Sequence, residues 1–409
     1  MSILSQFKQS QNTDFPNVRP SLDLRFALAK KLDPRITFTR GSTGTYFGPD
    51  GIMRTAGVNE PRFDHDPITG QSLGLMIEES RTNLYTRSDI EGSVGSTPTG
   101  FQPAAGASSG QSVVVSTDIS LGPNGQSAKH TRGTSSDSNM GYIFSSGLTV
   151  GQTYCASIWL YIPPSQAQKF AGKTITIPAE TSPAVTYISL GSFNTNLVGV
   201  WQRAYSVFTA NSTGVGIIPR TTAVAGSFFY TDCWQLEQGS FPTSYIPTTA
   251  STVTRSADNA QMTGTNFSSW YNQSEGTVFC SFKTDGISGN PRTFQLTGNN
   301  QNERLDHRII GTTNGSEYYT GGINFGRIDD NGVTNPSQGK ITVSQNSRSR
   351  QFCMNGRTVK SATIPNAPAV NTLNIGNYNL QATYLNGTIS RLTYYPIQLT
   401  NQQLINLTS

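Results

Sequence analysis

The stretch from Thr231 to Asn259 constrains the fold of this chain more than any other. Its first part, Asp232–Glu237, alternates polar and apolar residues as a β-strand does. Its second part, Gly239–Thr249, contains Pro242 and Pro247, which forbid a helix and punctuate an extended passage. The stretch therefore predicts a strand that closes one domain, and then an extended linker with few internal hydrogen bonds that leads to the next domain.

The composition indicates the class of fold. The chain has 409 residues, 40 of them glycine, and only 13% are charged. Thr, Ser, Asn, Tyr and Phe are abundant, which favours β-strands joined by tight turns. A chain of this length can bury two or three separate cores. We therefore expect an all-β array of domains.

Charge and hydropathy argue against two classes of partner. The net charge is +5, and residues 251–409 carry 12 basic and 8 acidic residues without a run of Lys or Arg. Nucleic-acid binding requires clustered cations, so we expect no nucleic-acid partner. No stretch approaches the roughly 18 apolar residues of a membrane span, and the N-terminus lacks the apolar core of a signal peptide. We expect a soluble protein without membrane insertion.

Residues 1–88 predict a small β-rich region. Residues 1–20 have no periodic apolar face and predict an extended arm, whereas Leu22–Ala27 alternates as a strand. The turn residues of Gly48–Gly51 predict a hairpin with a second strand near Met53. Three or four short strands bury too little apolar surface to offset the conformational entropy of this region, so it should need a partner.

Residues 89–250 predict a β-sandwich or jelly roll. The clearest strand is Thr153–Ile162, in which Tyr154, Ala156, Ile158 and Leu160 share one face and Cys155, Ser157, Trp159 and Tyr161 share the other. Further strands are expected at 185–190, 201–209 and 226–236. Strands at this spacing with turn residues between them are typical of a sandwich.

Residues 251–409 predict a second sandwich. A strand is expected at Gly276–Phe282, and Asn355-Gly356 between two strands predicts the positive φ angles of a type I′ hairpin. Near the end of the chain, Thr400 and Gln403 have the spacing of a capping box and predict a short helix.

Several of these segments resemble parts of bacteriophage virion proteins. The sequences of Asn59–Pro67 and Gly74–Leu84 resemble the N-terminal region of phage tail and fibre proteins. Leu148–Tyr154, Trp201–Arg203 and Asp232–Glu237 resemble carbohydrate-binding-module-like jelly rolls. The order of elements in the last 159 residues resembles the laminin-G/concanavalin A-like lectin fold, and the stretch 231–259 resembles the junction between two such modules.

The resemblance implies an architecture and a setting. It implies an N-terminal virion-attachment and oligomerisation region over 1–88, a jelly roll over 89–250 and a lectin-like sandwich over 251–409. We expect a non-enzymatic tail-fibre or receptor-binding adhesin located in the phage particle and assembled in the host cytoplasm. Its modules would recognise host surface glycans. A head fibre or capsid decoration protein and a glycan-degrading tailspike are the alternatives.

The resemblance also implies partners. Phage fibres commonly assemble around a three-fold axis, so we expect a homotrimer held mainly by residues 1–88, which would also contact other virion proteins. The two β modules would then project outward and face the glycan.

Candidate sugar-binding residues are aromatic. Tyr318 and Tyr319, near Arg327 in a glycine-rich segment expected to be a loop, could form an exposed platform for a sugar ring. Trp201 and Trp234 could stack on a sugar or be core residues. The resemblance to lectins raises the question of calcium, for which the candidate ligands in the last module are Asp306, Asp329 and Asp330, although no ligand spacing ties them together.

Nothing in the sequence indicates catalysis or a cofactor. It contains no nucleophile elbow, phosphate-binding loop, dinucleotide fingerprint or zinc cluster. Asp64-His65-Asp66 could bind a metal or act as a base, but adjacent residues of an extended chain point apart, so we interpret it as a polar turn with Arg62 as an ion partner. We expect no catalytic residues, no metal and no cofactor.

The cysteines fall into two pairs along the chain. Cys155 and Cys233 lie in the middle module, and Cys280 and Cys353 lie in the last. Each pair could form a disulfide, but a protein assembled in a reducing cytoplasm favours small buried thiols instead.

Overall fold

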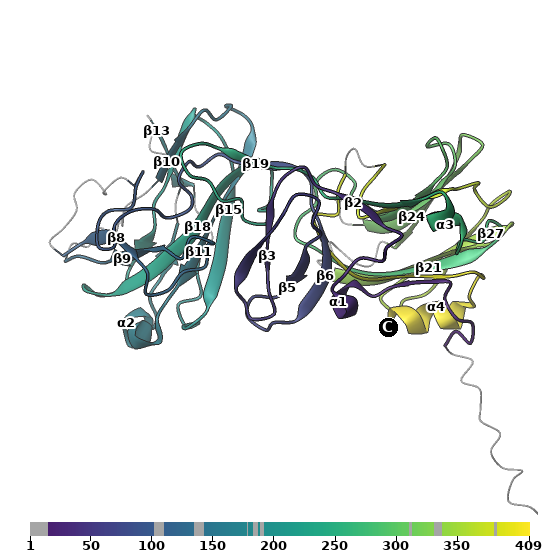
Figure 1. Ribbon diagram of the computed structural model, residues 1–409, viewed down its shortest axis with the longest axis horizontal. Helices are drawn as coiled ribbons and strands as arrows, with labels where there is room; N and C mark the ends of the chain where they lie inside the picture. Colours follow the sequence, from purple (N-terminus) through teal and green to yellow (C-terminus); the bar gives the residue numbers. More distant parts are fainter. Residues whose placement is uncertain are drawn as a thin grey trace, which may run out of the picture. The chain divides into compact units, whose positions relative to one another are not determined.

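The chain folds into two compact units. The computed structural model describes residues 15–101, 110–134, 143–177, 179–182, 187–188, 192–310, 313–330, 338–379 and 383–409. The middle unit comprises Phe38–Asp258 and Asp285–Ser288, and the C-terminal unit comprises Asn259–Thr284, Gly289–Ser409 and the described residues up to Thr37. Strands dominate both units, which confirms the all-β fold (Figure 1). No helix in these described ranges is long and apolar enough to cross a membrane.

The middle unit contains a β-sandwich. One sheet has the strand order β15-β11-β18-β9-β8, and a second has the order β10-β16-β13-β14. Side chains from both sheets form one hydrophobic core. The strands of the two sheets are β8 (Ser112–Ser116), β9 (Ser127–Thr131), β10 (Ile143–Ser146), β11 (Thr153–Tyr161), β13 (Ala179–Ser182), β14 (Tyr187–Ile188), β15 (Trp201–Thr209), β16 (Gly214–Ile217) and β18 (Phe228–Gln238).

The other elements of the middle unit are short. Of the strand expected at 185–190, only Tyr187–Ile188 lies within the described residues. The remaining elements are β3 (Gly44–Phe47), β4 (Met53–Ala56), β5 (Phe63–His65), β6 (Ser72–Ile77), β7 (Arg81–Asn83), η2 (Pro164–Gln166), α2 (Ala167–Phe170), β12 (Ile175–Thr176), β17 (Arg220–Thr221) and β19 (Val253–Arg255). Strand β2 (Thr37–Thr39) lies at the boundary of the two units.

Strand β11 has the two faces that its alternation predicts. Tyr154, Ala156, Ile158 and Leu160 belong to the sandwich core. On the opposite face, Trp159 is also buried, because the β3–β4 hairpin covers it and the ring of Phe47 lies 5.2 Å from the indole ring. The first part of the chain therefore packs on the outer face of this sheet.

The compact units divide the chain differently from the expected three regions. Residues 38–88 belong to the middle unit, and Tyr85 and Ile90 are part of the sandwich core. Residues 15–37 belong to the C-terminal unit, where β1 (Leu22–Leu24) pairs with β30 (Gly387–Tyr395). Whether 1–88, 89–250 and 251–409 act as separate modules stays a prediction. The expected strand ends at Leu24, because α1 (Phe26–Ala29) forms a helical turn.

The predicted linker is instead a largely buried segment, residues 242–248, which we call the strap. Residues 242–248 have no regular structure, yet distant side chains accept or donate hydrogen bonds along their backbone. Glu78 accepts the N–H of Ser244 at 2.7 Å, and Ser88 accepts the N–H of Thr248 at 3.0 Å. The prediction of a linker with few hydrogen bonds was wrong, because the partners that satisfy this backbone lie far away in the sequence.

A buried ionic cluster closes the strap onto the first part of the chain. We call Arg40, Arg62, Glu78, Arg255 and Asp258 the clasp, and all five side chains are at most 5% exposed. Burial alone would raise the pKa of Glu78, but the charges of Arg255 and Arg62 outweigh it and lower the pKa to about 2. The lowered pKa stabilises the fold fully above the ordinary pKa of glutamate, and this contribution is lost as the pH falls towards 2.

The C-terminal unit is a second sandwich. One sheet has the strand order β28-β27-β26-β21-β30, with β1 on β30, and the other contains β20-β29-β22-β23-β24-β25. His307 joins the two layers, because its ring lies 5.6 Å from both Phe282 and Phe352. The elements are β20 (Asn259–Thr263), α3 (Thr265–Ser268), β21 (Gly276–Thr284), β22 (Arg292–Thr297), β23 (Arg304–Ile310), β24 (Thr313–Thr320), β25 (Ile323–Asp330), β26 (Gln338–Gln345), β27 (Ser349–Met354), β28 (Lys360–Thr363), β29 (Thr372–Ile375), β30 and α4 (Asn401–Thr408).

Two local predictions for this unit are confirmed. Thr400 caps α4, and Gln403 completes the capping box. Asn355 and Gly356 have φ angles of 48° and 69°, and they open the five-residue turn between β27 and β28.

Replacing Gly356 by valine should destabilise the C-terminal unit by about 1–3 kcal/mol, because a β-branched residue is strained at positive φ. A Cβ atom there would also lie 2.7 Å from the Ser409 hydroxyl oxygen. Thermal unfolding followed by calorimetry measures the loss. Gly356→Asn is the matched control, since asparagine tolerates this conformation and should lose less. An unchanged melting temperature in Gly356→Val would contradict the assigned turn.

Buried carboxyl groups, among them Asp89, Asp232 and Asp64, make the stability of the middle unit sensitive to pH. Asp232 is buried and accepts backbone N–H groups from Leu121, Gly122 and Cys233 at 2.7–2.8 Å. Burial raises its pKa to about 6, and burial together with the charge of Asp232 raises the pKa of Asp89 to about 7. In this pH range the folded state binds more protons than the unfolded state.

The stability of the middle unit should therefore fall as the pH rises from about 4 to about 7. Its melting temperature should be higher at pH 5 than at pH 8, and calorimetry at both values checks this. The variant Asp89→Asn should reduce the dependence, since an amide does not titrate while Asp232 and Asp64 still do. A melting temperature that rises over this interval in the native chain would contradict the assignment.

All four cysteines are buried free thiols.

Candidate functional site

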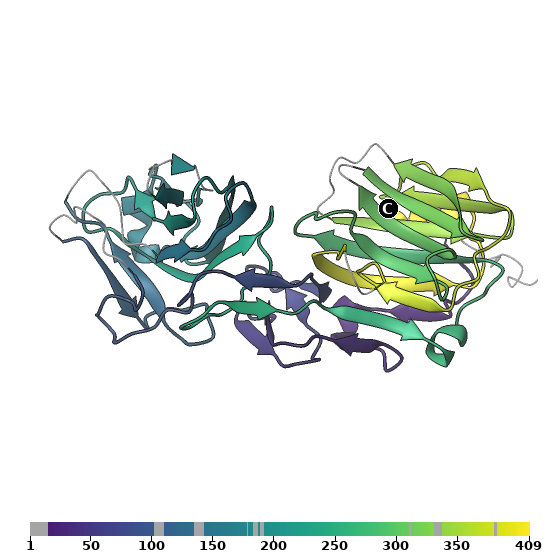
Figure 2. The ribbon, with the colours of Figure 1, turned by 90° about the horizontal axis from the view of Figure 1, so that it is seen from above.

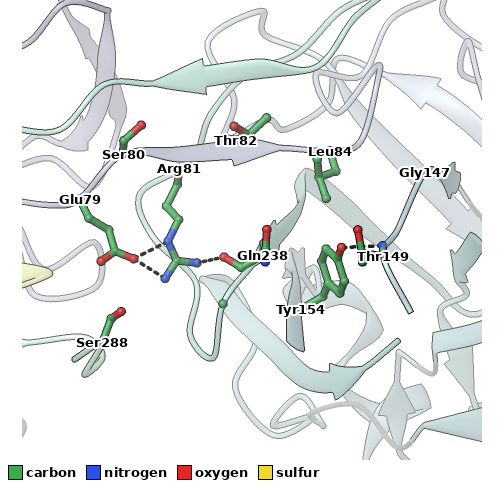
Figure 3. A pocket seen from close by; sticks show the side chains of 11 residues that line it. Glu79, Ser80, Arg81, Thr82, Leu84, Gly147, Thr149, Tyr154, Gln238 and Ser288 are labelled. Atoms are coloured by element: carbon green, nitrogen blue, oxygen red, sulfur yellow. Dashed lines mark hydrogen bonds and ion pairs between the residues drawn. The ribbon is translucent and has the colours of Figure 1, made fainter. Parts of the chain in front are cut away.

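A polar pocket of about 480 Å³ lies within the middle unit (Figure 3). Its walls are the segment that leads into and through β7, the loop before β11 with the start of that strand, the end of β18, and Ser288. Its volume lies in the range of roughly 300–1,000 Å³ that is usual for ligand sites. The lining residues are Glu79, Ser80, Arg81, Thr82, Leu84, Gly147, Thr149, Tyr154, Gln238, Gly239 and Ser288.

The side chain of Arg81 is held in one orientation by its neighbours in this pocket. Its Nε and Nη2 atoms both lie 2.6 Å from Oε1 of Glu79, and Nη1 donates to the carbonyl of Gln238 (Figure 3). The guanidinium also lies 4.7 Å from the ring centre of Phe241. A Cβ atom at Gly239, where φ is 137°, would collide with this guanidinium. The local backbone therefore holds Arg81 in one position with its charge compensated.

The rest of the lining is rich in hydroxyl and amide groups. Ser80, Thr82, Thr149 and Ser288 contribute hydroxyls, and Gln238 contributes an amide that donates to Gln152 at 3.2 Å. The Tyr154 hydroxyl accepts the N–H of Thr149 at 2.9 Å. Neutral donors and acceptors around a compensated ion pair suit an uncharged ligand with many hydroxyl groups.

The lining does not supply the usual pair of carboxyl groups for glycoside hydrolysis. That reaction generally uses two carboxyls, one as the acid and the other as the base or nucleophile. Among the residues that line the pocket, Glu79 is the one carboxylate, and it is paired with Arg81.

The structure separates the two tyrosines expected to form a platform. Both lie in strand β24 and not in a loop, so their side chains point to opposite faces of the sheet. Tyr318 is fully buried and its hydroxyl donates to the carbonyl of Asn366. Tyr319 is half-buried on the other face, where the Arg304 guanidinium lies 3.5 Å from its ring centre. The prediction that both rings form one exposed platform is therefore wrong.

Arg327 lies on strand β25, on the same face as Tyr319. It donates from Nη2 to Asp329 at 2.7 Å and to Thr313 at 3.0 Å. A sugar-binding role for Tyr319 and Arg327 stays a prediction.

The two tryptophans differ in burial. Trp234 is fully buried in the sandwich core, and its ring lies 5.3 Å from Phe101. Trp201, at the start of strand β15, is half-buried beside Tyr161 at 5.5 Å. Of the two, only Trp201 could offer a ring to a ligand, and that role stays a prediction.

The Asp64-His65-Asp66 cluster holds backbone together. Asp64 accepts the N–H of Phe47 at 2.7 Å, and Nδ1 of His65 lies 2.9 Å from the carbonyl of the same residue. Asp66 accepts N–H groups of the following turn. Burial raises the pKa of Asp64 to about 7. The expected ion partner of this cluster was wrong, because Arg62 pairs with Glu78 and Asp258 in the clasp.

Arginine side chains pair with the calcium candidates. Asp306 lies 3.2 Å from Arg292, Asp329 contacts Arg327, and Asp330 lies 3.1 Å from Arg357. Within the described ranges, no group of three or more His, Cys, Asp or Glu residues could hold a metal ion.

The sequence does not indicate the pocket, because its walls come from four segments that lie far apart in the chain. Glu79 and Arg81, which form an ion pair, lie two residues apart in the sequence. Gln238 and Thr149 carry no motif that would join them to residue 81. The one usable signal was Gly239 after a long strand, which is the position that admits the guanidinium.

Comparison with known proteins shows low similarity. No family model and no curated protein matches the chain. Among solved structures, it is similar to the CBM40 of the Ruminococcus gnavus IT-sialidase bound to α2,3-sialyllactose, with 17% identity over 35% of this chain and 87% of that one and a TM-score of 0.32. It is similar to the leech intramolecular trans-sialidase, with 19% identity over 34% and 23% of the two chains and a TM-score of 0.30.

A third similarity is to the receptor-binding domain of botulinum neurotoxin mosaic serotype C/D. It has 14% identity, covers 36% of this chain and 39% of that one, and has a TM-score of 0.27. At these values the similarities carry no inference about a ligand or an activity.

Proposed function

We propose that the chain is a non-enzymatic structural protein of a phage particle, of the tail-fibre or receptor-binding type, which binds host surface glycans through its β-sandwich units. The single observation that carries the binding part is the pocket around Arg81. Its hydroxyl and amide lining suits a neutral sugar, whose own hydroxyl groups both donate and accept hydrogen bonds.

The phage setting rests on the resemblance of residues 21–88 and 231–259 to virion proteins. A homotrimer belongs to this proposal. Light scattering on the full chain should give about three times the monomer mass of 44.2 kDa, and a monomer would contradict the trimer. Negative-stain localisation of a labelled copy distinguishes a tail fibre from a head fibre or decoration protein.

Glycan binding is tested with the full chain on an array of neutral bacterial polysaccharides, followed by calorimetry on an oligosaccharide of the strongest hit. The variant Gln238→Ala should weaken that binding about tenfold, because one hydrogen bond to the sugar contributes roughly 1.4 kcal/mol. Gln402→Ala, at an exposed position on α4, is the matched control and should bind as the native chain does.

Two results would overturn the proposal. Equal affinity of Gln238→Ala and the control would remove the pocket as the binding site. Release of reducing sugar from the bound polysaccharide would replace the adhesin by a glycan-degrading tailspike.

A further inference from the structure

A second candidate site lies on one face of a sheet in the C-terminal unit, separate from the pocket. Five polar side chains face one another across adjacent strands β29, β22, β23, β24 and β25, and we call them the polar row. Its members, in direct register, are Asn374, Gln295, Asp306, Glu317 and Arg327. The opposite face of the same strands carries Leu373, Leu296, Leu305 and Tyr318, which belong to the buried hydrophobic residues.

The polar row is desolvated although it lies on the face away from the core. Gln295 and Asp306 are 0% exposed, and Glu317 is 3% exposed. Charged groups this deeply buried require partners, since an uncompensated buried charge is costly. Figure 1 shows β24 and β21 in separate layers of the C-terminal unit. Figure 2 looks down on the layer that contains β24.

The charged groups here are only partly satisfied. Glu317 accepts from Arg304 at 2.9 Å and from Arg308 at 2.6 Å. Three buried donors, however, have no hydrogen-bond partner in the part of the chain that the structure describes: Nε of Arg304, Nε of Arg308 and Nη1 of Arg327. One buried acceptor, Oδ1 of Asp306, likewise has no hydrogen-bond partner among the described residues. The unmatched groups are mainly arginine N–H donors, which suit an anionic acceptor.

Aromatic and amide groups form an accessible rim. Tyr319 and Tyr378 are half-buried and lie on the Arg304 guanidinium, at 3.5 Å and 5.9 Å from their ring centres. Asn324, which is exposed, donates to the Tyr319 hydroxyl at 2.7 Å. A sugar ring packs its C–H groups on such tyrosines while its polar groups reach amides and guanidinium groups.

The balance of charge favours an acid. Arg292, Arg304, Arg308 and Arg327 face Asp306, Glu317 and Asp329 on this surface, which leaves one cation in excess. Burial also raises the pKa of Asp306, which weakens its negative charge. The hydroxyl groups of a neutral sugar could accept from the arginine donors but would leave the excess positive charge uncompensated, whereas a carboxylate would accept from the same donors and compensate that charge.

We propose that this face binds an acidic oligosaccharide, with the carboxylate of a sugar residue accepting from Arg308 and its neighbours and with Tyr319 and Tyr378 contacting the sugar ring. The proposal does not depend on the pocket around Arg81, because the two sites lie in different compact units and are expected to take sugars of different charge.

The test uses the full chain, a hexasaccharide of galacturonic acid, and the same hexasaccharide with its carboxylates methyl-esterified. The native chain should bind the acid at least tenfold more tightly than the ester. Arg308→Gln should lose at least tenfold in affinity for the acid, whereas Arg348→Gln, the same change at an exposed arginine of the β26–β27 turn, should lose none. Gln238→Ala should bind the acid as the native chain does, which separates this site from the pocket.

A salt titration on the native chain keeps the test independent of any variant. Affinity for the acid should fall as the salt concentration rises, and affinity for the ester should not. Equal binding of acid and ester, no measurable binding of the acid, or equal loss in Arg308→Gln and Arg348→Gln would overturn the proposal.

Discussion

Replacing Asp258 by alanine should destabilise the middle unit by about 3–5 kcal/mol, which is the usual cost of breaking a buried ion pair. Asp258 is fully buried, and its carboxylate accepts from Arg40 at 3.0 Å, from Arg62, and from the backbone N–H of Glu78 at 3.0 Å. Without it, Arg62 and Arg255 keep only the carboxylate of Glu78, and Arg40 loses the carboxylate with which it pairs. A loss of this size is a large part of the stability of a typical domain.

Chemical denaturation of the full chain measures this loss in the transition of the middle unit. The matched control is Asp50→Ala, which removes an ion pair with Arg54 in which both side chains are more than 40% exposed. Exposed pairs contribute little, so the control should unfold with the native chain. If both variants unfold alike, the clasp does not hold the strap against the first part of the chain.

The second large effect is expected at Trp234. The variant Trp234→Ala should cost the middle unit about 3–5 kcal/mol, because it leaves a large cavity in the sandwich core. The indole is 0% exposed, packs edge-on against Phe101 and donates from Nε1 to Thr231 at 3.2 Å. Denaturation with the fluorescence of the other tryptophans as the signal measures the loss.

Trp201→Ala is the matched control for Trp234→Ala, because Trp201 is half-buried at the start of β15. It should cost clearly less. A Trp234→Ala variant of native stability that bound glycans weakly would instead assign Trp234 to a binding surface.

Local patterns predicted the strands well. The strands expected at 153–162 and 201–209 match β11 and β15 to within one residue, because each strand has one face in the sandwich core. Asn355-Gly356 and the Thr400 cap were also predicted, since a positive φ and a helix N-terminus are set by adjacent residues. Features that depend on residues close together in the sequence can therefore be predicted from this sequence.

Features that depend on residues far apart in the sequence were not predicted. The composition of residues 242–248 predicts an extended linker with few hydrogen bonds, yet Glu78 and Ser88 bind the backbone of this segment. Similarly, the glycines around Tyr318 and Tyr319 suggested a loop, but the segment is strand β24 with one polar face. No local rule tells a polar buried sheet face from a loop.

The candidate sites follow the same logic. The Glu79–Arg81 pair joins two residues of one short segment, but the pocket also needs Thr149 and Gln238, which only the fold brings near. On the β24 face, the sequence indicated Tyr319 and Arg327. Arg304, Arg308 and Glu317 join them through the register of three strands, which the sequence does not determine.

The most direct test of glycan recognition by this protein is hydrogen–deuterium exchange of the full chain, with and without a neutral oligosaccharide selected on the array. We predict slower exchange on binding in three of the four segments that line the pocket, residues 79–84, 147–154 and 238–239. Saturating binding that leaves exchange in all three segments unchanged would contradict the assignment of the pocket as the glycan site.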